Sequence, residues 1–267
     1  MEAVWTRYFP LSIYVRDIIT SGRIGTVHRI HADNSLSLSP EKSFAGEKHR
    51  MVNMDLAGGA LLDLGIYSLT WVFQCAWTTQ EKSKRQKPSI LAATKAYHKT
   101  GADEMMTILL TFPRSMEDGG DLHAVASTGM RTSSDPTGDR KSGGPSIRIY
   151  GDKGEIQVFP PAFRPVYTKL VLHDGTVEDK HWTMPGPGKG SGWKNGFGDS
   201  LNAEGEGHGM FFEADEAGFA LLEGRLEGQY EDLDESIVIM EVMDEARKQG
   251  GLKYPEAIES LEYPLKL

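Results

Sequence analysis

Residues 146–159 read Ser146-Ile-Arg-Ile-Tyr150, Gly151-Asp-Lys-Gly154 and Glu155-Ile-Gln-Val-Phe159. The outer pieces are short and rich in β-branched and aromatic residues, whereas the middle piece has the Gly and Asp typical of a tight turn. Because so short a connection joins only antiparallel neighbours, the stretch predicts a β-hairpin. An antiparallel sheet is therefore the expected centre of the fold.

Further strand patterns flank this hairpin. Turn residues separate several of them, such as Pro160-Pro161 and the turn at residues 173–175. The other expected strands cover residues 25–38, 90–98, 105–112, 123–128, 168–173 and 177–182. Because most of these strands follow one another without a helix between them, they indicate an antiparallel meander rather than βαβ units.

Helical patterns occupy the rest of the chain. They cover residues 11–23, 60–73, 211–226 and 234–249. The second is apolar nearly all round, which is typical of a buried helix. The last two begin with acidic residues, which suits the positive end of a helix dipole. Together the patterns predict a single α+β domain over residues 1–267, with an open, mostly antiparallel sheet and helices on one face.

The composition is that of an ordinary globular protein, with 39% hydrophobic residues, 25% charged residues and a net charge of −9. This acidic balance argues against a nucleic-acid partner. No apolar run approaches the length of a membrane span, and the N-terminus lacks a signal-peptide pattern. The single cysteine, Cys75, suits a reducing compartment. We therefore expect a cytoplasmic protein without membrane partners.

Asp63 and Tyr67 form a candidate catalytic pair. They lie four residues apart on a predicted helix, so their side chains share one face. A carboxylate beside a phenol can orient or polarise the hydroxyl, which then donates or accepts a proton at a substrate oxygen. Gly58 and Gly59 would let a ligand approach the start of this helix. Spacing alone favours the alternative, a polar pair that caps a buried helix.

A second candidate group surrounds Arg7. Aromatic residues beside an arginine suit a polyhydroxylated or oxyanionic ligand, because the rings cover an apolar face and the guanidinium binds oxygens. The candidate substrate-binding residues are Trp5, Arg7, Phe9, Trp71 and His208. The alternative, favoured by spacing alone, is a hydrophobic plug with Arg7 in a surface ion pair.

The sequence predicts neither a metal site nor a nucleotide site. No two of the eight histidines stand at a metal-ligand spacing with a carboxylate on a helix. No Gly-x-Gly-x-x-Gly follows a strand into a helix. The alternating glycines of residues 186–192 and 205–209 predict a mobile loop over a pocket instead. We expect no cofactor, and NADP only if a nucleotide-binding domain is supplied from elsewhere.

Several motifs in order along the chain resemble the Gfo/Idh/MocA oxidoreductase family, in particular its branch of dihydrodiol and NADP-dependent D-xylose dehydrogenases. The motifs that carry this resemblance are Met1-Glu-Ala-Val-Trp-Thr-Arg-Tyr-Phe-Pro10, Gly58-Gly-Ala-Leu-Leu-Asp-Leu-Gly-Ile-Tyr67, Arg148-Ile-Tyr-Gly-Asp-Lys-Gly-Glu-Ile-Gln-Val158, Glu213-Ala-Asp-Glu216 and the segment 234–248. They span nearly all of the chain.

The resemblance implies a division of labour. In that family an N-terminal Rossmann domain holds the nicotinamide and carries a catalytic lysine in a Glu-Lys-Pro segment. The C-terminal α+β domain supplies the substrate wall and a tyrosine, which corresponds to Tyr67, and its open sheet is commonly an oligomer interface. The Rossmann glycines and the lysine are absent from this sequence, so the resemblance implies a C-terminal domain alone.

Three functions follow as hypotheses. The first, which we favour at this point, is a cofactor-independent isomerase, cyclase or lyase of specialised metabolism, including pericyclic chemistry, with Tyr67 as proton donor, Asp63 as its orienting group and Arg7 as oxyanion anchor. The second is an NADP-dependent dihydrodiol or D-xylose dehydrogenase whose Rossmann half lies outside this chain. The third is a non-catalytic binding or dimerisation module. Exposed apolar helix faces would favour a homo-oligomer in each case.

Overall fold

A computed structural model describes residues 1–44, 46–195, 204–262 and 264. Within these ranges the centre is one sheet of eight strands in the order β2-β3-β4-β1-β5-β6-β7-β8. The strands are β1 (Val27–Ser35), β2 (Ser89–Ala96), β3 (Asp103–Phe112), β4 (Leu122–Gly129), β5 (Ile147–Gly151), β6 (Gly154–Val158), β7 (Tyr167–Leu172) and β8 (Val177–His181). The sheet is open and mostly antiparallel, which confirms the predicted class.

The first strand departs from a simple meander. β1 lies in the middle of the sheet, antiparallel to β5 but parallel to β4, with Arg29 opposite His123. The strands from β2 to β4 and from β5 to β8 are the expected antiparallel runs. Local turn residues predicted those runs, but they carry no information on where an isolated early strand inserts.

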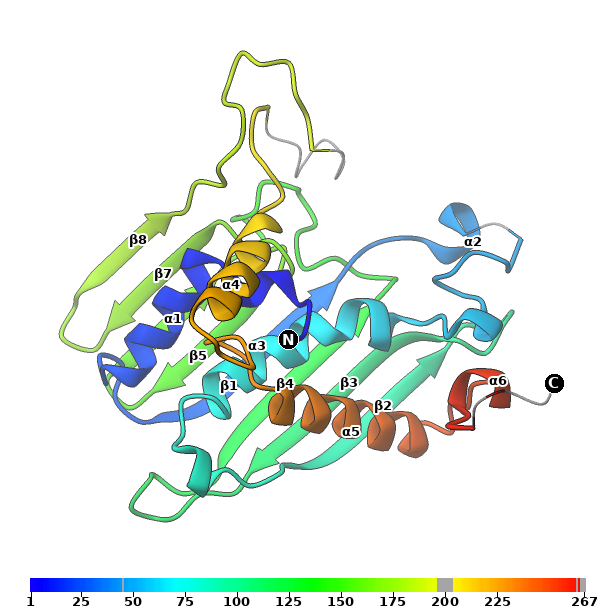
Figure 1. Cartoon of the computed structure of the whole chain (residues 1–267), viewed down its shortest axis with the longest axis horizontal. Helices are drawn as coiled ribbons and strands as arrows, with labels where there is room; N and C mark the ends of the chain where they lie inside the picture. Colours follow the sequence, from blue (N-terminus) through cyan, green and yellow to red (C-terminus); the bar gives the residue numbers. More distant parts are fainter. Residues whose placement is uncertain (45, 196–203, 263, 265–267) are drawn as a thin grey trace.

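The helices lie on one face of the sheet (Figure 1). The longer ones are α1 (Pro10–Thr20), α3 (Ile66–Ala76), α4 (Phe211–Leu222) and α5 (Leu233–Gln249). Short turns complete the set: α2 (Pro40–Ser43), α6 (Glu256–Glu259), η1 (Trp5–Tyr8), η2 (Met54–Leu56), η3 (Leu61–Gly65) and η4 (Lys82–Lys84). The predicted helical segments are therefore present, and α4 ends four residues earlier than the pattern at 211–226 indicated.

α3 is the central helix. It packs on β1 and β4 and contacts α5, and every residue from Ser68 to Ala76 is buried. Its all-round apolar surface, noted in the sequence, is explained by this position between sheet and helices. The segment Met54–Ala76 is long and apolar enough to span a membrane by length and composition, and 67% of that window is buried inside the domain.

Candidate functional site

The start of the central helix is fixed by a buried carboxylate on β3. Asp103 Oδ2 accepts a hydrogen bond from the Leu61 backbone N–H at 2.6 Å. Gly59 has φ +149°, and a Cβ there would lie 1.9 Å from Asp103 Oδ1. Glycine is therefore required for the close approach of this carboxylate. Asp103 acts as a capping group from a distant strand, and it satisfies helix N–H groups that would otherwise be buried without a partner.

Burial raises the pKa of Asp103 to about 7, against hydrogen bonds from the backbone that lower it. The folded protein thus keeps this proton to higher pH than an unfolded chain, in which the pKa of an aspartate has its ordinary value of 3.8. The associated stability is complete below pH 4 and is lost as the pH rises through 7.

We expect wild type to lose up to about 1.4 kcal/mol per pH unit relative to Asp103→Asn over that range. Urea unfolding of both proteins from pH 4 to 8 measures this, and parallel curves would contradict it.

A single π-helical turn, η3, carries Asp63 one turn before Tyr67. The wider turn takes one backbone carbonyl out of the regular helical hydrogen-bond pattern. The Asn34 side-chain amide donates a hydrogen bond to the carbonyl oxygen of Leu64, at 3.0 Å. Such bulges occur frequently at functional sites. The turn therefore supports Asp63 and Tyr67 on a backbone that is held by contacts from β1 and β3.

Tyr67 is half-buried against two aromatic residues. Its hydroxyl accepts a hydrogen bond from Trp5 Nε1 at 2.8 Å, and its ring lies 5.9 Å from that of Phe163. Burial raises the pKa of Tyr67, while the hydrogen bond from Trp5 opposes that rise. Because an indole N–H can only donate, the hydroxyl proton of Tyr67 remains available for a ligand oxygen.

Asp63 forms an ion pair with Arg50, which projects from the loop before η2. Its carboxylate is about one-third exposed, and it contributes to raising the pKa of Tyr67 through its negative charge. The carboxylate thus acts on Tyr67 through space, and its hydrogen bond goes to Arg50. The role of Asp63 as an orienting group for Tyr67 stays a prediction.

The other predicted site residues lie at different depths. Trp5 contacts Tyr67 directly. Phe9 and Trp71 are fully buried, and Trp71 Nε1 donates to Ala162 O at 2.8 Å. Their surroundings are those of core residues, so their assignment to substrate binding stays a prediction.

Arg7 is only 2% exposed and forms an ion pair with Glu235. Its Nε lies 4.0 Å from Glu231 Oε2. This guanidinium therefore joins η1 to the loop before α5 and to α5 itself. His208 is partly exposed, with its ring 6.4 Å from that of Trp193. For Arg7 and His208, too, substrate binding stays a prediction.

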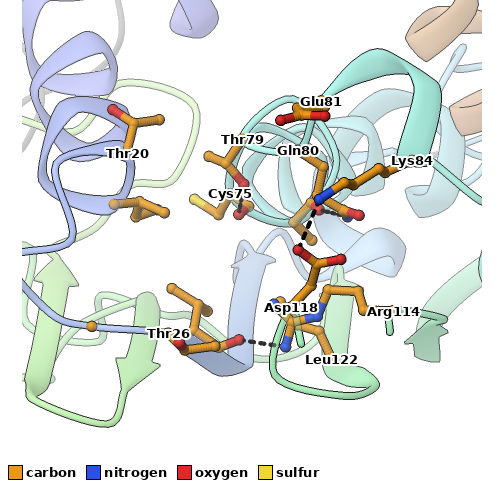
Figure 2. Close-up of a pocket in the computed structure, with 14 residues that line it drawn as sticks. Thr20, Thr26, Cys75, Thr79, Gln80, Glu81, Lys84, Arg114, Asp118 and Leu122 are labelled. Atoms are coloured by element: carbon orange, nitrogen blue, oxygen red, sulfur yellow. Dashed lines mark hydrogen bonds and ion pairs between the residues drawn. The ribbon is translucent and has the colours of Figure 1, made fainter. Parts of the chain in front are cut away.

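A pocket of about 310 Å³ lies at the opposite end of α3 (Figure 2). Lys84 Nζ and Asp118 Oδ1 meet at its rim at 3.1 Å, and Cys75 lies at its wall. Burial raises the pKa of the Cys75 thiol to about 12, so the thiol is not a nucleophile at neutral pH. Cys75 is eight residues, about 12 Å, along the helix from Tyr67, so this pocket is separate from the candidate site.

The predicted glycine-dense loop falls partly outside the described residues, which exclude 196–203. In its described part, a Cβ at Gly205 would lie 2.0 Å from the Gly188 carbonyl carbon. A Cβ at Gly207 would lie 2.4 Å from Pro185 O. These glycines let two arms of the loop pack against each other, so they do not form an open cradle for phosphate.

The chain is similar to known oxidoreductases. Residues 13–157 match the family model of the GFO/IDH/MocA C-terminal domain. The chain is 46% identical to D-xylose 1-dehydrogenase (NADP(+)) of Hypocrea jecorina, over 100% of this chain and 63% of that protein. It is 28% identical to trans-1,2-dihydrobenzene-1,2-diol dehydrogenase of Bos taurus, over 96% and 63%. The chain thus spans 63% of the length of these curated relatives.

Solved structures share the fold at low identity. An aldose-aldose oxidoreductase from Caulobacter crescentus matches with a TM-score of 0.61 and 16% identity, over 92% of this chain and 60% of that one. KijD10, a 3-ketoreductase from Actinomadura kijaniata solved with NADP and TDP-benzene, matches with a TM-score of 0.58 and 16% identity, over 93% and 62%.

These relatives correct two predictions. The hypothesis of a cofactor-independent isomerase, cyclase or lyase of specialised metabolism is wrong, because the relatives are dehydrogenases and reductases. The expectation of no cofactor is wrong as well, because the D-xylose relative is named for NADP(+). Both predictions rested on the absence of a nucleotide-binding motif from this sequence.

Proposed function

Because this chain belongs to the GFO/IDH/MocA family, we propose that it forms the substrate-binding part of an NADP-dependent dehydrogenase that acts on a sugar or a dihydrodiol. The observation that carries this proposal is the 46% identity to the D-xylose dehydrogenase along the whole chain. The weaker identity to the dihydrodiol dehydrogenase extends the substrate class to vicinal diols on an apolar ring. Both substrate classes present neighbouring hydroxyls.

The described residues fit the substrate side of such an enzyme better than the cofactor side. NADP supplies the hydride acceptor when bound. A phosphate cradle needs open backbone N–H groups, usually at a glycine turn before a helix. Gly186, Gly205 and Gly207 pack the two arms of the loop against each other, and the backbone N–H groups of Gly190 and Gly192 donate to Glu204 Oε1. We therefore assign no cofactor contact to these residues.

Tyr67 is the group that we propose to contact the reacting oxygen. Its raised pKa keeps the phenol neutral at pH 7, so it donates a hydrogen bond to a substrate hydroxyl or carbonyl. Trp5 fixes the phenol oxygen from one side, and Phe163 excludes water from the ring. In this arrangement the Tyr67 hydroxyl can donate its proton in a hydrogen bond to the substrate oxygen.

The proposed activity is tested with the protein purified from its own source. D-Xylose and trans-1,2-dihydrobenzene-1,2-diol are offered separately with NADP⁺ and with NAD⁺, and NADPH or NADH formation is followed by absorbance. We expect NADPH with at least one of the two substrates and much slower reaction with NAD⁺. Absence of reduced cofactor with both substrates would overturn the proposal.

We also propose a homo-oligomer through the sheet face that the helices leave open. Leu91, Leu109 and Val125 are direct cross-strand neighbours on β2, β3 and β4. Leu91 is 68% exposed and Leu109 is 42% exposed, so this row offers apolar area for a second copy. Two copies can present the same row of side chains to each other in a symmetric contact.

This proposal predicts that Leu109→Glu converts the oligomer to a monomer, because two buried carboxylates would face each other at the interface. Sedimentation velocity measures the change. Met116→Glu, the same kind of substitution in the exposed loop after β3, is the control and should leave the mass unchanged. A monomeric wild type, or an unaffected Leu109→Glu oligomer, would contradict the interface.

A further inference from the structure

A pocket of about 270 Å³ is lined by residues of the N-terminal segment, of the turn before α3 and the start of α3, of the loop before α5 and of α5. The N-terminus, α3 and α5 lie near one another in Figure 1. Its apolar wall includes Leu62 and Ile66 from the segment that also carries Asp63 and Tyr67, and Met240 from α5. Three polar side chains, Glu2, Glu231 and Ser236, line it as well. The pocket is distinct from the one at the far end of α3 and has not been used in the proposed reaction.

Glu231 is the unusual group in this pocket. It is 2% exposed, and neither carboxylate oxygen has a hydrogen-bond partner among the described residues. Arg7 approaches it at 4.0 Å, but the guanidinium donates to Glu235, Tyr230 O and Thr70 O. The single guanidinium of Arg7 therefore faces two buried carboxyl groups, those of Glu231 and Glu235.

The imbalance leaves the Glu231 carboxyl without a hydrogen-bond partner at the pocket wall. A buried carboxylate is strongly destabilising unless it is paired and hydrogen-bonded. The hydroxyl of Ser236 is also buried without a partner in the described part of the chain. A ligand that brings positive charge and several N–H donors would satisfy both groups, whereas a purely apolar ligand would satisfy neither.

We propose that this pocket binds a guanidinium or primary ammonium group through Glu231, with the alkyl stem of the ligand against Leu62, Ile66 and Met240. Ser236 accepts a further N–H. Guanidinium and ammonium groups carry donors only, and their stems commonly lie along apolar surface while the head reaches a charge. A free amine and a Lys or Arg side chain of another polypeptide share this chemistry.

The first experiment compares matched probes by isothermal titration calorimetry. n-Butylguanidinium and the neutral n-butylurea have the same stem and nearly the same shape. We expect wild type to bind the cation at least tenfold more tightly than the urea, and Glu231→Gln to remove that preference. Glu117→Gln, an exposed acid in the loop after β3, is the control and should bind as wild type does. Equal binding of both probes, or a preference that survives Glu231→Gln, would overturn the proposal.

A second variant keeps the test valid if Glu231→Gln folds poorly. Met240 lies at the rim and is partly exposed, so Met240→Trp fills the pocket without disturbing the buried charges. It should abolish binding of n-butylguanidinium while urea unfolding remains close to that of wild type. Undiminished binding to a folded Met240→Trp protein would place the cation elsewhere and overturn the assignment.

The pH dependence gives an independent readout. The charged and titratable groups that face Glu231 are Arg7 and Tyr8 from η1, Glu2 from the N-terminal segment, Glu213 from α4 and Glu235 from α5. Burial is the main cause that raises the pKa of Glu231 to about 8, and Arg7 opposes it. Cation binding therefore requires loss of a proton, and affinity at pH 9 should exceed that at pH 7 about tenfold. A pH-independent affinity would contradict Glu231 as the anchor.

A peptide then distinguishes the two sources of the ligand, a free amine and a side chain of another polypeptide. Acetyl-Leu-Arg-Leu-amide presents the same guanidinium within a polypeptide, with an apolar side chain on each side of it. Binding at least tenfold tighter than n-butylguanidinium identifies a polypeptide side chain as the occupant, and equal or weaker binding identifies a free amine. Failure of both cations to bind would overturn the site, and neither result depends on dehydrogenase activity.

Discussion

Replacing Tyr67 by Phe lowers turnover at least tenfold and leaves the fold intact. The substitution removes one hydroxyl that is half-buried and held by Trp5, and it keeps the ring that packs against Phe163. A side chain placed to transfer a proton to or from a reacting oxygen typically contributes about 100-fold or more to the rate. The loss should appear in kcat, because the phenol acts on the oxygen whose charge changes during the reaction.

The measurement is steady-state NADP⁺ reduction with D-xylose or the dihydrodiol, alongside thermal unfolding of both proteins. Trp5→Phe is the matched second variant. It removes the hydrogen bond that opposes the raised pKa of Tyr67, so the basic limb of the rate profile should move to higher pH. Unchanged turnover in a folded Tyr67→Phe protein would exclude the proposed contact at the reacting oxygen.

Replacing Arg7 by Met destabilises the protein by about 3–5 kcal/mol at pH 8, because both buried carboxylates lose their cation. Methionine keeps much of the volume, so the effect reports charge. Below pH 5 the loss should be smaller, since the raised pKa values of Glu231 and Glu235 allow both to be neutral there. Urea unfolding at the two pH values measures this.

The triple variant Arg7→Met, Glu231→Gln, Glu235→Gln is the control. It removes the cation together with both charges, and it should recover most of the lost stability. Its KM then distinguishes two roles of Arg7. An unchanged KM shows that the arginine joins η1 to α5, whereas a large rise in KM would support the predicted contact between Arg7 and substrate. A stable single variant would contradict the ion-pair account.

Much of the fold could be predicted from sequence, because its signals are local. The hairpin β5–β6 follows from a four-residue glycine turn between alternating residues, and the buried helix α3 follows from its apolar surface. The position of β1 could not be predicted, since its partners β4 and β5 are set by long-range packing.

The site was predicted less completely, for a related reason. Tyr67 and Trp5 were identified as candidates by type, yet their hydrogen bond joins positions 62 residues apart. Asp103 and Glu231 were missed because nothing in the neighbouring sequence indicates that an acid at the start of a strand or in a loop is buried. Arg50 reaches Asp63 from a polar loop that looked featureless. The error over the cofactor has another origin, because that expectation rested on the absence of a nucleotide-binding motif from this sequence.

The insertion of β1 between β4 and β5 has a consequence for how the chain acquires its structure. The strands from β2 to β4 and from β5 to β8 can pair as local hairpins. β1 precedes them in the sequence, but it can pair only after strands of both groups have been synthesised. Closure of the sheet therefore depends on contacts between residues such as Ile30 and Ala124 that are far apart in sequence. Such non-local closure slows folding. During synthesis the two groups of hairpins would form separately. β1, the first strand in the sequence, would pair with them last.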